Sequence, residues 1–275
     1  MELVAEKEIV QADETTVRVL DEGKTRTAWL WTFIGKEGDQ ELIGYQYSPN
    51  RSGETPVKVL GGTKGFLISD GYTGYNKVTT PEGRERVGCL AHLRRRFFDA
   101  LSSAPEARRA LDLILEVYKV EKIASDLGIV GAPKHLALRQ EKSRQAMQDL
   151  RAWLEAEQPK HLPKGPMGEA ITYALNQWGP LTRFLDNARL PVDNNGSERA
   201  LRPAALGRKN YLFVGHDQAG QNIAGLYSLI ATREVNGVNP FEYLSDVLPQ
   251  LGSHPASRID ELLPHTWKPP PAAPS

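Results

Sequence analysis

The hydrophobic period of this chain changes near Val87, where a strand-rich part gives way to a mostly helical block, and a mixed segment follows from Leu190. Before Val87, stretches rich in Val, Thr, Ile and aromatic residues predict four strands. The strands are expected over residues 9–20, 27–34, 42–47 and 66–68, with a helix over 52–60 before the last of them. The second and third strands are expected to pair as a hairpin. The first part of the chain therefore predicts three strands, a helix and a fourth strand, in that order.

After Val87, apolar residues recur at helical spacing, beginning with Leu90, Leu93, Phe97 and Leu101. Further helical patterns cover residues 107–127, 134–157, 167–178 and 221–234. The tail after Gly252 is rich in proline and is expected to lack fixed structure. The predicted divisions are residues 1–88, 89–190 (mostly helical), 191–251 and 252–275.

Composition excludes several classes of protein. No apolar run is long enough to span a bilayer, and residues 1–10 lack the apolar core of a signal peptide, so a cytoplasmic protein without a membrane partner is expected. The single Cys89 excludes an internal disulfide and a multi-cysteine zinc site. Lys and Arg number 34 and Asp and Glu 34, so the chain lacks the basic excess typical of DNA-binding proteins. A cytosolic enzyme with a small-molecule substrate fits these totals too.

Three carboxylates are candidates for chemistry, and each has a structural alternative. Asp13 shares strand parity with Ile9, Val17 and Val19, which places it on the more buried face; it could instead bond to nearby backbone. Asp70 follows an apolar strand, where sites tend to form in α/β sheets, but Asp-Gly is also a turn signal.

Glu198 has the strongest structural alternative. Asn195 could cap a helix with Glu198 completing a capping box, and Glu198 could also pair with Arg202 four residues later. Taken together, however, the three carboxylates lie on a first strand, after a fourth strand and at the start of a later helix. Such a set can hold Mg²⁺, which prefers oxygen ligands, and two such ions promote in-line phosphoryl transfer.

Five segments together resemble the transposases of the insertion-sequence-66 family. They are residues 12–15 (ADET), 69–76 (SDGYTGYN), 89–98 (CLAHLRRRFF), 193–203 (DNNGSERALRP) and 207–213 (GRKNYLF), in the expected order. The similarity spans roughly residues 9 to 250. One segment alone would be a weak signal, but five in order make chance similarity implausible.

The resemblance implies an α/β fold in which an RNase-H-like mixed sheet is flanked by helices. It also implies a large helical insertion between the second Asp of a catalytic triad and its Glu. Carried over motif by motif, the triad falls on Asp13, Asp70 and Glu198, which would bind Mg²⁺ or Mn²⁺. Full-length members of the family carry a long region ahead of the catalytic domain, whereas Met1 here is only twelve residues before Asp13. The chain is therefore expected to be the C-terminal catalytic portion.

Positive charge is segregated in two places. Arg94 and Arg95 lie in a run of three arginines, and Arg199, Arg202, Arg208 and Lys209 lie in a stretch without acidic residues. Both could contact DNA phosphates, although a charge run is more often a solvated helix face. Cys89 and His92 lie on one side of a helix, and because two further metal ligands cannot be placed, the pair is interpreted as structural.

These inferences predict a DDE-type transposase, a polynucleotidyl transferase that cuts DNA at transposon ends and joins it to target DNA. Transposon-end and target DNA, accessory proteins of the same element and further copies of the chain are the expected partners, and the protein is expected at the nucleoid. One alternative is a catalytically silent remnant that binds DNA or a partner transposase. Another is a structure-specific nuclease of the same fold. A third alternative, a metal-free enzyme that acts on a small molecule, is supported only by the balanced charge.

Overall fold

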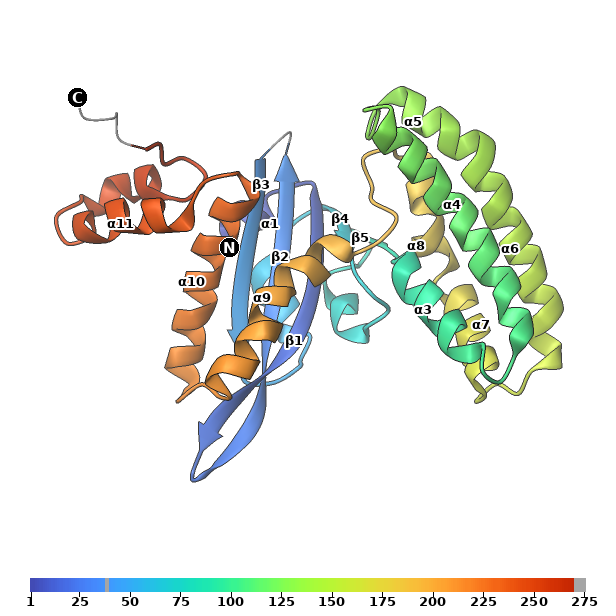
Figure 1. The fold of residues 1–275 in the computed structure, drawn as a ribbon, viewed down its shortest axis with the longest axis horizontal. Helices are drawn as coiled ribbons and strands as arrows, with labels where there is room; N and C mark the ends of the chain where they lie inside the picture. Colours follow the sequence, from blue (N-terminus) through green and yellow to red (C-terminus); the bar gives the residue numbers. More distant parts are fainter. Residues whose placement is uncertain (38–39, 270–275) are drawn as a thin grey trace. The chain divides into compact units, whose positions relative to one another are not determined.

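The computed structural model describes residues 1–37 and 40–269. The chain forms an α/β fold with a mixed five-stranded sheet in the order β3-β2-β1-β4-β5, flanked by helices (Figure 1). The predicted fold class is thereby confirmed, and the arrangement is compatible with an RNase-H-like fold. The chain divides into two compact units, described separately below. The first comprises Met1–Gly65, Gly74–Arg84 and Gly196–Ser275, and the second Phe66–Thr73 and Glu85–Asn195.

The first unit is built on a long hairpin that the sequence pattern only partly anticipates. Its strands are β1 (Ile9–Asp21), β2 (Lys24–Glu37) and β3 (Gln40–Ser48), and its helices α1 (Glu2–Ala5), α2 (Glu54–Leu60), α9 (Asn195–Tyr211), α10 (Asp217–Val235) and α11 (Pro240–Gln250). Glu22 and Gly23 connect β1 to β2 with φ angles of 43° and 80°. Positive φ at both positions is typical of the two-residue hairpin turn that matches strand twist. The predicted pairing of the second and third strands is confirmed.

The core of the first unit lies between one face of the β1–β3 sheet and helices α9 and α10 (Figure 1). Apolar residues at alternate strand positions supply the sheet side, including Val17, Leu30 and Tyr45. Ala200, Leu201 and Ala204 supply the α9 side at helical spacing, and small side chains there allow close packing. On the opposite face α1 packs over Gly35 and Gly44, where an added Cβ would lie 2.7 Å from Lys7 Cγ and 2.3 Å from Met1 Sδ.

Helix α10 also covers the exposed edge of β3. Ser228, Thr232 and Asn236 recur every four residues and bond to the backbone of Glu41, Ile43 and Tyr45. The helix and strand spacings match because four residues advance about 6 Å along a helix and two residues advance about 6.7 Å along a strand. The outward N–H groups of Glu41, Ile43 and Tyr45 are therefore bonded within the chain, which hinders pairing of this part of β3 with a further strand.

The C-terminal segment contradicts the expectation of a tail without fixed structure. Residues Ala256–Leu262 form a 3₁₀ helix, and Leu262 and Trp267 pack on Tyr243 of α11. Trp267 also donates a hydrogen bond from Nε1 to Asp246 at 2.6 Å. The proline-rich composition is therefore compatible with packing at least to residue 267. Pro270 and Pro271 lie outside the described residues.

The second unit is mainly helical. It contains the strands β4 (Gly65–Ile68) and β5 (Arg84–Val87), whose first residues fall in the first unit, and the helices α3 (Leu90–Ala100), α4 (Arg108–Asp126), α5 (Pro133–Leu138), α6 (Arg144–Glu157), α7 (Pro166–Asn176) and α8 (Trp178–Thr182). Helix α3 packs on α4 and α7, and α4 packs on α6. A π-helical turn over Arg139–Ser143 links α5 to α6, so the pattern over residues 134–157 is one interrupted helix.

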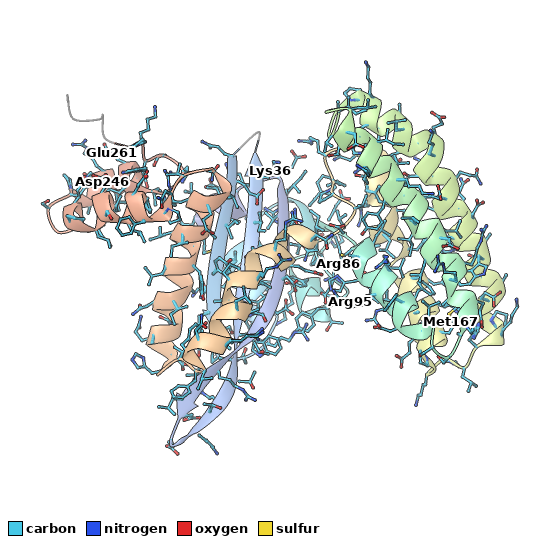
Figure 2. All side chains as sticks on the ribbon, in the orientation of Figure 1. Lys36, Arg86, Arg95, Met167, Asp246 and Glu261 are labelled. Carbon is cyan, nitrogen blue, oxygen red and sulfur yellow. The ribbon has the colours of Figure 1, made fainter. Side chains whose placement is uncertain are left out.

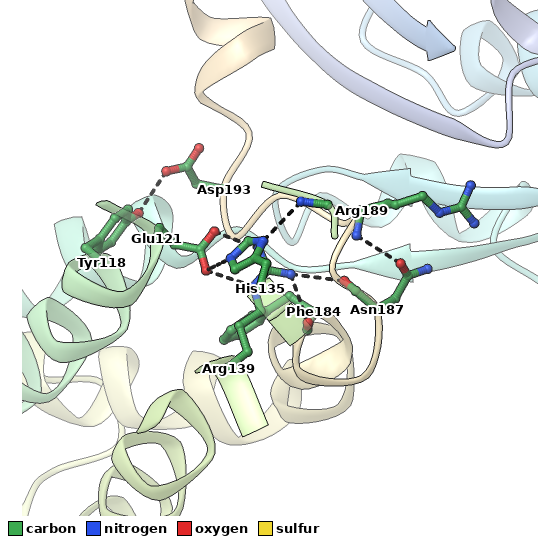
Figure 3. Close-up of polar contacts among 9 residues, drawn as sticks. Tyr118, Glu121, His135, Arg139, Phe184, Asn187, Arg189 and Asp193 are labelled. Atoms are coloured by element: carbon green, nitrogen blue, oxygen red, sulfur yellow. Dashed lines mark hydrogen bonds and ion pairs between the residues drawn. The ribbon is translucent and has the colours of Figure 1, made fainter. Parts of the chain in front are cut away.

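A buried ionic cluster fixes this π-helical turn (Figure 3). Arg139, 1% exposed, donates from Nε and Nη2 to the two carboxylate oxygens of Glu121 on α4, at 2.8 and 2.7 Å. Its Nη1 donates to the backbone carbonyls of Phe184 and Asn187, each at 3.0 Å. His135 Nδ1 accepts from the Gly131 N–H, and His135 Nε2 lies 3.1 Å from Glu121. One carboxylate thus joins α4, α5 and the segment before residue 190.

Candidate active site

Asp13 lies on the face of β1 that helices α9 and α10 cover. Residues 13, 17 and 19 share strand parity, and Val17 and Val19 belong to the core beneath those helices. Asp13 pairs in register with Thr32 of β2, which in turn pairs with Tyr45 of β3. One row across three strands therefore carries a carboxylate, a hydroxyl and a phenol on the same face. Asp13 is partly buried, and its Oδ1 accepts a hydrogen bond from the Glu14 N–H at 2.8 Å.

Helix α9 is anchored along this face by contacts in three places. At its start, a Cβ on Gly196 would lie only 2.5 Å from Gln11 Oε1, so Gln11 lies directly against the first turn. In the second turn, the Tyr45 hydroxyl donates to the carbonyl of Ala200. Near its end, Arg208 Nη1 donates to the carbonyl and hydroxyl oxygens of Thr16, at 2.8 and 2.9 Å.

These anchors determine where the first turn of α9 lies. Glu198 belongs to that turn, two residues after Gly196 and two before Ala200, and is partly buried. The first unit therefore brings the turn that carries Glu198 onto the same sheet face as Asp13. Glu198 also lies where the partial positive charge of a helix N-terminus stabilises a carboxylate.

The start of α9 differs from the capping box that the sequence allowed. Asn195 is the first helical residue, and its N–H and its side-chain Nδ2 donate to the Asp193 carboxylate at 3.1 and 2.7 Å. Asp193 also accepts a hydrogen bond from the Tyr118 hydroxyl at 3.0 Å (Figure 3). The carboxylate that bonds to the first residue of the helix is therefore that of Asp193. The Asn195 side chain donates a hydrogen bond instead of accepting one as an N-cap would.

Asp70 lies in the second unit, two residues after β4 ends at Ile68. Its Oδ1 accepts a hydrogen bond from the Tyr72 N–H at 2.9 Å, which is the turn geometry that Asp-Gly favours. The Tyr173 ring from α7 packs on this turn, since a Cβ on Gly71 would lie 2.7 Å from Tyr173 Cε2. Arg96 of α3 lies over the same ring, 4.2 Å from its centroid. Burial, with a smaller contribution from the charge of Asp70, raises the pKa of Tyr173 to about 12.

The donors in the first unit favour a hard cation. Among the described residues, no group of three or more His, Cys, Asp or Glu side chains is arranged to hold a metal ion. Beside Asp13, however, Thr32 Oγ1 and Gln11 Oε1 are buried oxygen atoms without a hydrogen-bond partner in the described structure. Mg²⁺ and Mn²⁺ prefer oxygen ligands such as carboxylates and water, and neutral oxygens around the carboxylate can bond to that water. The residues present therefore fit a divalent cation of this class better than zinc.

Glu14, next to Asp13, is a buried carboxylate that sequence reasoning missed. Its side chain is 2% exposed and accepts hydrogen bonds from Arg51 Nε at 2.7 Å and the Tyr75 hydroxyl at 2.8 Å. Arg51 also lies over the Trp29 ring, 5.1 Å from its centroid. Because Glu14 has the opposite strand parity to Asp13, its side chain faces the other side of the sheet, and its bonds hold β1 in place on that side.

The predicted DNA-contacting residues differ in exposure. Arg94 and Arg95 are exposed on α3, and Figure 2 shows Arg95 among the side chains of that helix. Arg199, Arg202 and Lys209 are exposed on α9. Arg208, in contrast, is partly buried and bonds to Thr16. The first five residues are exposed to solvent, whereas Arg208 holds α9 on the sheet.

Cys89 has a structural environment. It is fully buried, and its Sγ accepts a hydrogen bond from the Asn194 N–H at 3.2 Å. Burial raises the pKa of its thiol to about 12, so a thiolate is disfavoured as a metal ligand or nucleophile. The bond also ties the start of α3 to the segment that leads into α9.

Comparisons with known proteins cover nearly the whole chain. A family model described as "Transposase IS66 family" matches residues 1–222, and one described as "IS66 C-terminal element" matches residues 228–265. Two similar relatives come from Sinorhizobium fredii. "Uncharacterized protein y4qI" is 34% identical, with 98% of this chain and 52% of the relative covered. "Uncharacterized protein y4hP" is 32% identical, with 95% and 51% covered.

A third relative from that organism, "Uncharacterized protein y4jD", is 33% identical, with 94% of this chain and 53% of the relative covered. The chain therefore spans about half the length of the curated relatives that it matches. Within the described residues, no helix has the length and apolar character needed to cross a membrane.

Proposed function

The chain belongs to the IS66 transposase family, and we propose that it carries the catalytic centre that cuts and joins DNA strands, with Asp13, Asp70 and Glu198 holding divalent metal ions. The observation that carries the proposal is the convergence of Asp13 and the first turn of α9 on one sheet face. Asp70 is included in the proposal because its segment, residues 69–76, resembles the family motif that carries the second acidic residue. Magnesium or manganese is the proposed metal.

The proposed reaction consists of two phosphoryl transfers. In the first, a water oxygen bonds to a phosphorus at the transposon end, the bond to the 3′ oxygen breaks, and that oxygen takes up a proton. In the second, the freed 3′ hydroxyl bonds to a phosphorus of target DNA, loses its proton, and displaces the target's own 3′ oxygen. When bound, the divalent ions would stabilise the entering and leaving oxygens and offset phosphate charge.

Residues of the chain have separate proposed tasks in this reaction. Asp13 and Glu198 supply carboxylate oxygens from β1 and α9, and Asp70 supplies one from the turn after β4. The exposed cations Arg199, Arg202 and Lys209, with Arg94 and Arg95 on α3, would neutralise DNA phosphates. Arg208 would act mainly by holding α9 in place. Bringing two transposon ends together further implies several copies of the chain, with accessory proteins of the element and a nucleoid location as part of the same proposal.

Incubation with DNA tests this function. A plasmid carrying the ends of the element that encodes the chain is expected to be cut at those ends with Mg²⁺ or Mn²⁺, to remain intact with EDTA, and to yield joined products when target DNA is added. Cutting of branched DNA without joining would indicate a nuclease of the same fold. DNA binding without metal-dependent cutting would contradict the proposal and favour a silent DNA-binding remnant.

A further inference from the structure

Two buried side-chain oxygen atoms near Asp13 make no hydrogen bond within the described residues. Thr32 is 0% exposed, and its Oγ1 has no hydrogen-bond partner among the described residues. Gln11 Oε1 is likewise buried and without a partner there. Buried polar atoms in native proteins are normally hydrogen-bonded because the loss of water otherwise destabilises the folded state. Two such atoms around one carboxylate therefore require an explanation.

Thr32 and Gln11 are both neighbours of Asp13 on the same face of the sheet. Thr32 is the cross-strand partner of Asp13, and paired residues on one face have Cβ atoms about 4.5–5.5 Å apart. Gln11 precedes Asp13 by two residues and therefore lies on the same face of β1. Gln11 also lies against Gly196, in the helical turn that carries Glu198. The two oxygens thus flank Asp13 on the side from which α9 approaches.

Thr32 and Gln11 are polar residues beside an apolar part of the same sheet face. Their neighbours along the same face, Val17, Leu30 and Ile34, are apolar and belong to the core. Valine and leucine would fit a core position at Thr32 without leaving an unsatisfied hydroxyl. Gln11 Oε1 and Thr32 Oγ1, the buried oxygens of this face without a hydrogen-bond partner among the described residues, both belong to residues next to Asp13, which points to a ligand at that place.

We propose that Thr32 and Gln11 are positioning residues for the divalent-cation site, accepting hydrogen bonds from water molecules that hydrate the ion held by Asp13. This inference rests on the proposed function. A hydrated cation offers only O–H donors to its surroundings, and the Gln11 amide oxygen and the Thr32 hydroxyl oxygen can each accept a hydrogen bond. Mg²⁺ in particular retains several water molecules in protein sites, so acceptors around the carboxylate ligands are needed to orient them.

The test combines two measurements on the full chain: thermal unfolding without metal, and the dissociation constant for Mn²⁺ by calorimetry. In Thr32→Val the unsatisfied hydroxyl is removed, so the metal-free protein is expected to unfold at a higher temperature than the wild type. The same variant is expected to bind Mn²⁺ about 10-fold more weakly or worse, as typical for groups that orient a metal site. Thr32→Ser keeps the hydroxyl and is expected to bind Mn²⁺ with nearly wild-type affinity. Gln11→Met, which keeps length and removes the acceptor, should weaken binding similarly.

Ser143 provides a matched control in the second unit. Its Oγ is also buried without a partner among the described residues. Ser143→Ala is expected to raise the unfolding temperature and to leave the Mn²⁺ dissociation constant unchanged. Wild-type affinity in both Thr32→Val and Gln11→Met would overturn the inference while leaving the proposed function intact. Failure of the wild type to bind Mn²⁺, with or without DNA, would instead remove the metal site itself, and the inference with it.

Discussion

Asp13→Asn is expected to lower metal-dependent strand cleavage by more than about 100-fold. Loss of groups that merely orient a metal ligand typically costs 10–100-fold, and Asp13 is a proposed ligand itself. The amide is a neutral and much weaker donor for a hard cation than a carboxylate. Its oxygen can still accept the hydrogen bond from the Glu14 N–H, so the fold of β1 should be retained. Initial rates of cutting at saturating Mn²⁺ measure the effect.

Asp21→Asn is the control for this variant. Asp21 ends the same strand with the same parity, and its side chain is 45% exposed beside Arg26. Its replacement is expected to leave the cleavage rate within a few-fold of the wild type. Cleavage by Asp13→Asn at a rate similar to that of Asp21→Asn would remove Asp13 from the catalytic centre.

Glu121→Leu is expected to destabilise the folded chain by about 3–5 kcal/mol, the usual cost of removing one partner of a buried ion pair. Arg139 would remain 1% exposed, with the carbonyls of Phe184 and Asn187 as its remaining partners in this cluster. His135 would lose the same carboxylate (Figure 3). The midpoint of urea denaturation of the whole chain, followed by the circular dichroism signal of its helices, measures the change in stability.

A surface pair on the same helix provides the comparison. Lys122 and Asp126 of α4 are 75% and 61% exposed, so Asp126→Asn should cost less than about 1 kcal/mol. The double variant Glu121→Leu with Arg139→Met removes both charges and is expected to recover much of the lost stability. Equal stability of Glu121→Leu and Asp126→Asn would show that the cluster does not hold the helical unit together.

Much of the sheet could be predicted because its strands are rich in β-branched and aromatic residues. The strands over residues 9–20, 27–34, 42–47 and 66–68 all occur in the structure, somewhat extended. Strand β5 was missed because Arg84 and Arg86 break the apolar pattern. Arg84 is nevertheless buried, since its Nη2 donates to the carbonyls of Ala5 and Lys7 at 2.6 and 3.0 Å. A charged residue that bonds to backbone carbonyls cannot be distinguished from a surface residue by sequence pattern.

The cross-strand partner of Asp13 is predictable from the sequence. A turn at Glu22-Gly23 fixes the register of β1 and β2, and that register pairs Asp13 with Thr32. The sequence signal for the turn is a single glycine, Gly23, between two strands. In contrast, the contacts of Tyr45 with Ala200 and of Gln11 with Gly196 join residues more than 150 positions apart. No local pattern contains that information.

The carboxylates show why local alternatives were hard to exclude. Asp70 makes the turn hydrogen bond that its Asp-Gly sequence predicts, and Asp13 bonds to the neighbouring backbone N–H. Each bond uses Oδ1, and a carboxylate has two oxygens with about four acceptor positions. A local hydrogen bond and a metal-binding role are therefore compatible in one side chain, and the triad stays a prediction of the five motifs.

Calorimetric titration of Mn²⁺ into the wild type, Asp70→Ala and Asp99→Ala tests the three-carboxylate centre most directly. Asp99 is exposed on α3 of the same unit as Asp70 and serves as the matched control. Performed with and without a DNA fragment, the titration is expected to give binding by the wild type and Asp99→Ala and its loss in Asp70→Ala. Wild-type affinity in Asp70→Ala, or no binding by the wild type even with DNA, would contradict the proposed metal centre.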